Sequence, residues 1–119
     1  MDLHAFVLAN RLVGNAAHAA VLECTFAGPR FVVERACAVA VTGADMALTR
    51  NGQAVSAWRT LLLQAGDVVK LGAARAGMRS YIAFAGGIDV PVRLSSRATY
   101  LRGKLGGFEG RTLRTGDRL

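Results

Sequence analysis

The feature that most constrains the fold is the pair Asn51-Gly52, which separates two short strand-like runs, residues 46–50 and 53–58. Asn-Gly is the preferred pair for the centre of a type I′ turn, because both central residues of that turn need a positive φ. The twist of this turn matches the twist of two paired antiparallel strands. The sequence therefore predicts a β-hairpin that reverses at Asn51-Gly52.

Further short apolar runs on both sides of this hairpin have the same character. Glycine, proline and aspartate interrupt them every several residues, which is typical of strands joined by tight turns. Many short strands at this spacing indicate an antiparallel sandwich or barrel. The other predicted strands lie within residues 20–28, 30–36, 37–43, 59–67, 68–74 and 78–86, and the chain is expected to return to a strand at Leu113.

The first residues have a different periodicity. Apolar side chains such as Leu3 and Phe6 recur at three-and-four spacing over residues 2–13, which predicts a helix. Asp2 is well placed to cap the start of this helix, and Gly14-Asn15 stops it. We therefore expect one N-terminal helix followed by strands.

Length and composition limit the class of protein. A chain of 119 residues forms one domain at most, and 52% apolar with 19% charged residues is typical of a globular chain. No apolar run is long enough to span a bilayer, and the start lacks the basic region of a signal peptide. We expect a cytoplasmic protein with no membrane contact, in which Cys24 and Cys37 are buried free thiols.

The net charge of +7 is concentrated in residues 93–119, which hold seven basic side chains against two acidic ones. The arginines alternate with glycines and have no aromatic residues at a spacing that would stack on bases. Arginine is also the residue that holds carboxylates and phosphates. The segment therefore favours a small anionic ligand or an acidic partner protein over nucleic acid.

The stretch "AGGID" at residues 85–89 follows an apolar strand and admits two interpretations. Paired glycines can expose backbone N–H groups to a ligand, with Asp89 as a polar anchor. The same glycines can simply allow a tight turn that Asp89 stabilises locally. The pattern does not decide between the two.

The stretch "SSRATY" at residues 95–100 is open in the same way. Ser96, Arg97 and Thr99 could converge on an anion, because arginine binds a carboxylate through two parallel hydrogen bonds. Alternatively, Ser96 caps a short helix, or Arg97 forms a structural salt bridge with Asp89. The nearby run "GKLGGFEG" lacks the order of a phosphate-binding P-loop.

Longer motifs in the chain resemble a known family. They are "LANRLVGN" (8–15), "VTGAD" (41–45), "LGAARAGMRSYIAFAGGIDVP" (71–91) and "LSSRATYLRGKLGGFEGRTLRTGDRL" (94–119). Together they resemble the biotin-dependent carboxyltransferase family, which includes allophanate hydrolase subunit 2, the C-type subunit of 5-oxoprolinase and the Kip antagonist. Ser95 stands where the family usually has glycine, and Ala98 stands where it usually has serine.

The resemblance implies a mainly β, cyclophilin-like antiparallel barrel lobe with one N-terminal helix. Residues 1–119 would form a single partial domain of this kind, cut from a larger protein and therefore prone to form oligomers. The implied activity is that of the C-type component of a 5-oxoprolinase, which uses ATP to open 5-oxoproline to L-glutamate together with A-type and B-type partner subunits. The alternatives are the biotin-dependent carboxyltransferase part of a urea carboxylase or allophanate hydrolase system, and a non-catalytic regulatory module like the Kip antagonist.

We expect the ligand site in residues 86–103, with a small amide or lactam as substrate and no metal. The helix start is expected to approach this stretch. The expected catalytic residues are Asp89 and Arg97, and the expected substrate-binding residues are Asp2, Gly86, Gly87, Ser96, Thr99 and Tyr100.

Overall fold

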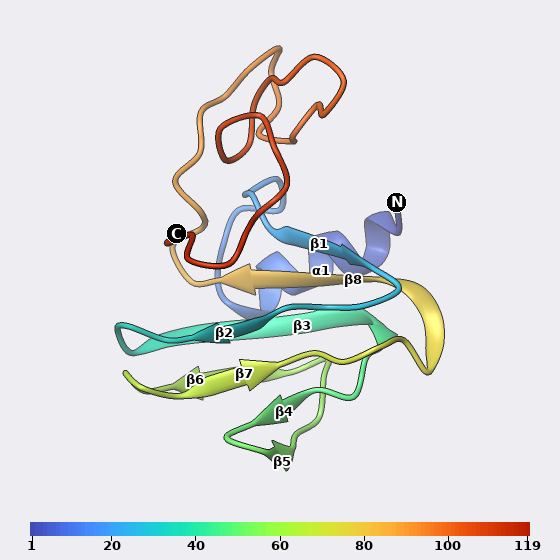
Figure 1. The fold of residues 1–119 in the computed structure, drawn as a ribbon, viewed down its shortest axis with the longest axis vertical. Helices are drawn as coiled ribbons and strands as arrows, with labels where there is room; N and C mark the ends of the chain where they lie inside the picture. The colour runs from blue at the N-terminus through green and yellow to red at the C-terminus, as the bar shows by residue number, and fades with distance from the viewer. The chain divides into compact units, whose positions relative to one another are not determined.

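The computed structural model describes residues 1–119 and is mainly β, with one helix at the start (Figure 1). The chain divides into two compact units, Met1–Gly87 and Ile88–Leu119. The helix and all eight strands belong to Met1–Gly87, which we call the strand unit. Ile88–Leu119 consists of turns and irregular backbone, and we call it the loop unit.

Helix α1 spans Leu3–Leu12, within the predicted range. Its first turn is capped as expected, because the Asp2 carboxylate accepts the backbone N–H of Ala5 at 3.0 Å. Ala5 and Ala9 are fully buried and pack against Tyr81 and Ala83 of strand β8. The small side chains on this face let the helix lie close to the sheet.

The first sheet contains four antiparallel strands in the order β1-β8-β3-β6. Strand β3 pairs with both β8 and β6, and its Val41 lies opposite Ile82 of β8. Because side chains alternate along a strand, β8 presents Tyr81 and Ala83 to α1 and Ile82 to the opposite face. The bounds are Leu22–Thr25 for β1, Cys37–Asp45 for β3, Thr60–Leu63 for β6 and Ala76–Phe84 for β8.

The second sheet has the order β2-β7-β4-β5 and is also antiparallel. Its hairpin reverses at Asn51 and Gly52, whose φ values of 51° and 80° are both positive, as a type I′ turn requires. The predicted hairpin is therefore confirmed. The bounds are Arg30–Val32 for β2, Thr49–Arg50 for β4, Gln53–Ala54 for β5 and Val68–Lys70 for β7.

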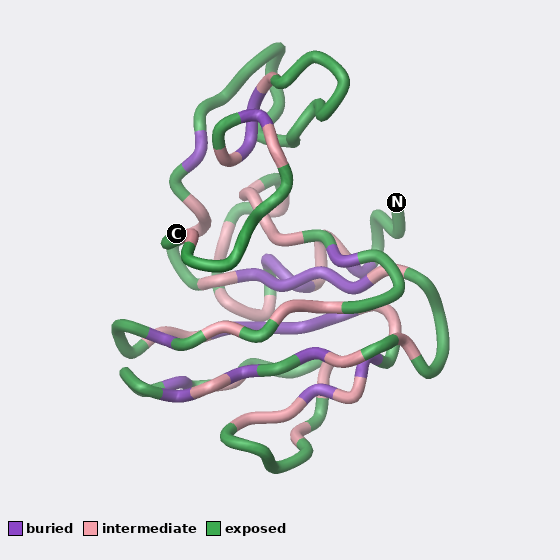
Figure 2. Tube along the Cα trace, in the orientation of Figure 1, coloured by how far each residue is buried: buried purple, intermediate pink, exposed green.

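A hydrophobic core lies between the two sheets and is seen as the buried stretches along the strands (Figure 2). Val39, Leu63 and Ile82 of the first sheet and Val69 of the second are at most 1% exposed. This arrangement confirms the predicted fold class, a mainly β lobe of antiparallel strands with one N-terminal helix.

In the loop unit, the strand predicted at Leu113 does not form, and the alternative in which Ser96 caps a short helix is not realised. The backbone explains both results, because four non-glycine residues of this unit have positive φ and interrupt any regular repeat. These residues are Leu94, Ser95, Lys104 and Glu109.

Candidate functional site

The paired glycines at the end of β8 make the sharp turn that the sequence predicted, with φ values of 89° for Gly86 and 80° for Gly87. Their N–H groups are both used in hydrogen bonds within the protein, so of the two interpretations the structure favours the tight turn. The Gly86 N–H donates to the Asn15 side-chain oxygen at 2.9 Å, and the Gly87 N–H donates to the Phe84 carbonyl at 2.9 Å. The turn uses its own donors to hold its shape.

Asn15 is the centre of a network that the sequence interpretation did not find. Its side-chain nitrogen donates to the Phe84 carbonyl at 2.8 Å and to the Asn10 oxygen at 3.1 Å. Asn10 is fully buried and donates to the Ala19 carbonyl at 2.9 Å. The motif "LANRLVGN" therefore ties the end of α1 to the end of β8, and Asn15 does more than stop the helix.

In the loop unit, the predicted ligand-binding side chains are exposed. Arg97 donates a short hydrogen bond to the Val90 carbonyl and forms no ion pair with Asp89. The alternative of a structural Asp89–Arg97 salt bridge is therefore not realised. Ser96 accepts the N–H of Ala98 at 3.0 Å, and the backbone of Tyr100 pairs with Leu105.

Ser95 has a φ of 60°, in the left-handed region that favours glycine. This conformation gives a physical reason for the glycine that the resembled family usually has at this position. The serine keeps the turn at some cost in strain.

The glycines of the loop unit pack against their own segment. A side chain at Gly106 would collide with the Ala98 carbonyl, one at Gly107 with Thr99, and one at Gly110 with the backbone of Lys104. These glycines allow close contact between turns. They do not form an open cradle for a phosphate.

Arg111 holds the last part of the loop unit together, and the sequence interpretation missed it. Its guanidinium binds both carboxylate oxygens of Asp117, at 2.7 and 2.9 Å, binds Glu109 at 2.9 Å and lies over the ring of Phe108. These hydrogen bonds lower the pKa of Asp117 to about 2 and raise the pKa of Arg111. The sequence did contain a signal, because Arg111 lies between Glu109 and Asp117, the two acidic residues of this basic segment, and is therefore a candidate for ion pairing with them.

Asp2, the one predicted site residue of the helix start, lies in the strand unit. Its backbone N–H donates to the Tyr81 hydroxyl at 2.8 Å, and its carboxylate caps α1. Tyr81 is 1% exposed, and burial raises the pKa of its hydroxyl. The approach of Asp2 to residues 86–103 stays a prediction.

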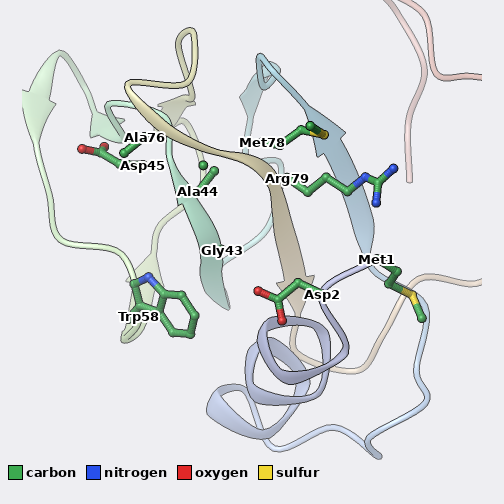
Figure 3. A pocket seen from close by; sticks show the side chains of 10 residues that line it. Met1, Asp2, Gly43, Ala44, Asp45, Trp58, Ala76, Met78 and Arg79 are labelled. Atoms are coloured by element: carbon green, nitrogen blue, oxygen red, sulfur yellow. The ribbon is translucent and has the colours of Figure 1, made fainter.

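A shallow pocket of about 590 Å³ lies beside Asp2 (Figure 3). It opens where the pairing of β3 and β8 shifts register between Gly43 and Asp45. Figure 3 shows Trp58 on one side of this pocket and the Asp2 carboxylate facing it across Gly43. Around this shift both strands carry glycine and alanine, and these small residues leave the space of the pocket open. The remaining lining residues are Met1, Ala44, Asp45, Ala76, Gly77, Met78 and Arg79.

Other chemistry is sparse. No group of three or more His, Cys, Asp or Glu side chains is arranged to hold a metal ion. Cys24 is a buried free thiol, and burial raises its pKa to about 11, which keeps it unreactive near neutral pH. The single helix is too short to cross a bilayer.

Comparisons with known proteins agree with one another. Residues 1–119 match the family described as "Carboxyltransferase domain, subdomain A and B". The chain is 43% identical over its whole length to the C-type subunit of 5-oxoprolinase from Escherichia coli. It is 38% identical, over 98% of its length, to urea amidolyase of Lachancea kluyveri. The chain spans 38% of the first relative and 6% of the second.

A solved structure supports the same relationship. The crystal structure of the K. lactis urea amidolyase superposes on 98% of this chain with a TM-score of 0.95 and 38% sequence identity. The chain covers 7% of that protein.

Proposed function

Because the chain belongs to the carboxyltransferase domain family of subdomains A and B, we propose that it is part of the C-type component of an ATP-dependent 5-oxoprolinase. This component would act with A-type and B-type partner subunits to open 5-oxoproline to L-glutamate. The observation that carries the proposal is the 43% identity to the C-type subunit of the E. coli 5-oxoprolinase, which extends over the whole chain.

The loop unit supports a role in a multi-subunit complex. Several of its apolar side chains are exposed, Leu94 by 87%, beside arginines that form no salt bridge. Exposed apolar groups with such arginines are typical of a surface that another subunit covers. The arginines are Arg93 and Arg102, and the other exposed apolar residues are Val92, Tyr100, Leu101, Leu113 and Leu119.

The residues of the glycine-rich segment do not fit ATP. Gly106, Gly107 and Gly110 each pack against the loop unit's own atoms on the side where a side chain would stand, so their lack of a side chain is explained by this packing. The proposal therefore assigns the nucleotide to a partner subunit, and we predict that the chain alone has no ATP-dependent 5-oxoprolinase activity.

A second candidate is the biotin-dependent carboxyltransferase part of a urea carboxylase. The TM-score of 0.95 with the K. lactis urea amidolyase favours it. Under this candidate the pocket between Trp58 and Asp2 suits the ureido ring of biotin, because the ring is flat and carries N–H groups. Biotin would supply the carrier for the carboxyl group.

One reconstitution experiment separates the two candidates. The complete protein that contains this chain is mixed with its A-type and B-type partners, and glutamate release from 5-oxoproline is measured with and without ATP. The proposal expects glutamate only when ATP and all components are present. Carboxylation of urea that depends on a biotin carrier, without any release of glutamate, would establish the second candidate and overturn the first.

A further inference from the structure

The pocket beside Trp58 lies outside the stretch that the sequence singled out, and its floor is unusually bare. Gly43 has a φ of 94°, and any side chain there would collide with the Arg79 carbonyl. On the opposite strand, Gly77 has a φ of 80°, and a Cβ added there would lie only 2.9 Å from the Ala44 side chain and collide with it. Between Trp58 and Asp2, a ligand would therefore rest on backbone and methyl groups.

Trp58 is held in an uncommon conformation. Its φ of 63° lies in the left-handed region, which a bulky residue rarely adopts, and its N–H donates to the Val41 carbonyl at 2.7 Å. The indole is nevertheless 44% exposed, so the core does not account for its position. Backbone strain of this kind clusters at ligand-binding sites, where the surrounding structure holds a side chain in position to contact a ligand.

The Asp2 carboxylate retains capacity to bind. Its oxygens can accept about four hydrogen bonds, and the cap to Ala5 uses one. Asp2 is exposed, and Figure 3 shows its carboxylate directed toward the space in front of the indole. Asp45, the other acid that lines the pocket, is directed away from Asp2 and is bound to Arg75 at 3.0 Å.

We propose that this pocket binds a small planar amide, whose flat face covers the Trp58 indole and whose N–H donates to the Asp2 carboxylate. A carboxylate only accepts hydrogen bonds, so the ligand must bring a donor. An aromatic face stacks on a flat group. Arg79 lines the same pocket and already supplies a positive charge, which disfavours a cation and leaves a neutral N–H group as the better match.

The inference rests on the proposed function, because 5-oxoproline is a lactam and supplies such a ring. The ureido ring of biotin has the same chemistry, so the two sources need separate arms in the test. The geometry of the pocket requires only that the ligand has a planar group with an N–H, which lies between the Trp58 indole and the Asp2 carboxylate.

Trp58 is the single tryptophan of the chain, so its fluorescence reports directly on occupancy. The 119-residue chain is titrated with 2-pyrrolidone, 5-oxoproline, urea and biotin amide. N-methyl-2-pyrrolidone is the matched control, because it keeps the ring and lacks the N–H. We expect saturable quenching by at least one N–H amide and binding at least about tenfold weaker for the N-methyl compound, because a hydrogen bond to a charged group is lost.

Asp2→Ser and Asp2→Asn test the acceptor without removing the helix cap, because serine and asparagine are both good N-caps. Asp2→Ser should weaken binding about tenfold. Glu34→Ser, at an exposed acid of the strand unit that does not line the pocket, is the matched control and should leave the affinity unchanged. The helical signal in circular dichroism verifies that α1 is intact in each variant.

Equal binding of N-methyl-2-pyrrolidone, equal loss in the Asp2 and Glu34 variants, or no saturable response to any amide would overturn the inference. Binding of biotin amide alone would assign the pocket to the carrier ring and not to a substrate. If the reconstituted complex releases glutamate while Asp2→Ser keeps full affinity and activity, the pocket assignment fails and the proposed function stands. If lactams bind in this pocket but the complex does not release glutamate, the pocket assignment stands and the proposed function fails.

Discussion

The turns Gln64–Asp67 and Arg114–Asp117 have the same internal hydrogen bonds but lie in very different surroundings. In each turn the aspartate accepts the N–H three residues earlier, at 2.8 Å in the strand unit and 2.7 Å in the loop unit. Gly66 and Gly116 supply the positive φ in both, at 91° and 96°. Four residues that end in Gly-Asp therefore determine the conformation of this turn without help from the rest of the chain.

The two aspartates differ in what else they bind. Asp67 also binds Arg50 at 2.7 Å and Asn51 at 2.9 Å, so its turn is joined to the β4–β5 hairpin and leads into β7. Asp117 is bound by Arg111, six residues away, and no strand follows. Sheet pairing stabilises one turn, whereas a single local arginine stabilises the other.

Removing core volume from the strand unit should have the largest effect. Ile82→Ala empties a fully buried position of the strand unit and should lower the free energy of unfolding by about 2–5 kcal/mol. Leu62→Ala, at a side chain 68% exposed on β6, is the control and should cost less than about 0.5 kcal/mol. Urea unfolding measures both, and equal losses would contradict the assigned core.

A second comparison uses two glycines of the loop unit. Gly107→Ala would place a carbon against the Thr99 side chain, whereas Gly116→Ala meets no atom within 4 Å. Both substitutions strain a positive φ at about 1–2 kcal/mol, but only Gly107→Ala adds a collision. Limited proteolysis of residues 88–119 should therefore be faster in Gly107→Ala, and equal rates would refute the close packing.

The paired turns offer a more direct test. Asp67→Asn removes a carboxylate that joins two parts of the second sheet, so it should lower the thermal midpoint by several degrees. Asp117→Asn should leave that midpoint nearly unchanged and increase cleavage within the loop unit. Calorimetry and proteolysis on the same samples measure both effects. A larger midpoint shift for Asp117→Asn would reverse the comparison.

The smallest effect is a pH dependence. The pKa of Asp117 is lowered from an ordinary value of 3.8 to about 2 by its hydrogen bonds to Arg111. A carboxyl with a lowered folded-state pKa stabilises the fold above pH 3.8, and this stabilisation is lost as the pH falls toward 2. The protection of the amides in residues 109–117, measured relative to their intrinsic exchange rates, should therefore decrease over this range, and Arg111→Gln should reduce this dependence.

The strand unit could largely be predicted because its signals are local. Asn51-Gly52 dictates its own turn, and apolar residues two positions apart, such as Val39 and Val41, lie on the same face of their strand and enter the same core. The predicted start of α1 at Asp2 and its predicted end before Gly14 are correct for the same reason.

The candidate site was harder to predict because it depends on contacts between distant residues. Asn15 lies 71 positions from Gly86, so no local pattern showed that the glycine N–H was occupied. The Trp58 pocket depends on a shift of register between β3 and β8, which the sequence does not reveal. Apart from the Gly-Asp turn at Arg114–Asp117, the loop unit has no regular apolar periodicity from which its turns could be recognised.

The stretch of residues 86–103 carries the central functional proposal, that its exposed polar residues serve a ligand and are not braces of the turn. Asp89 is exposed and Arg97 binds only a backbone carbonyl, so neither closes a salt bridge whose loss would destabilise the chain. The most direct measurement compares Asp89→Asn and Arg97→Lys in the complete complex, by 5-oxoprolinase turnover and by the thermal midpoint. The account predicts that turnover is abolished while the midpoint stays almost unchanged. A large fall in the midpoint, with proportionate activity in the protein that remains folded, would contradict it.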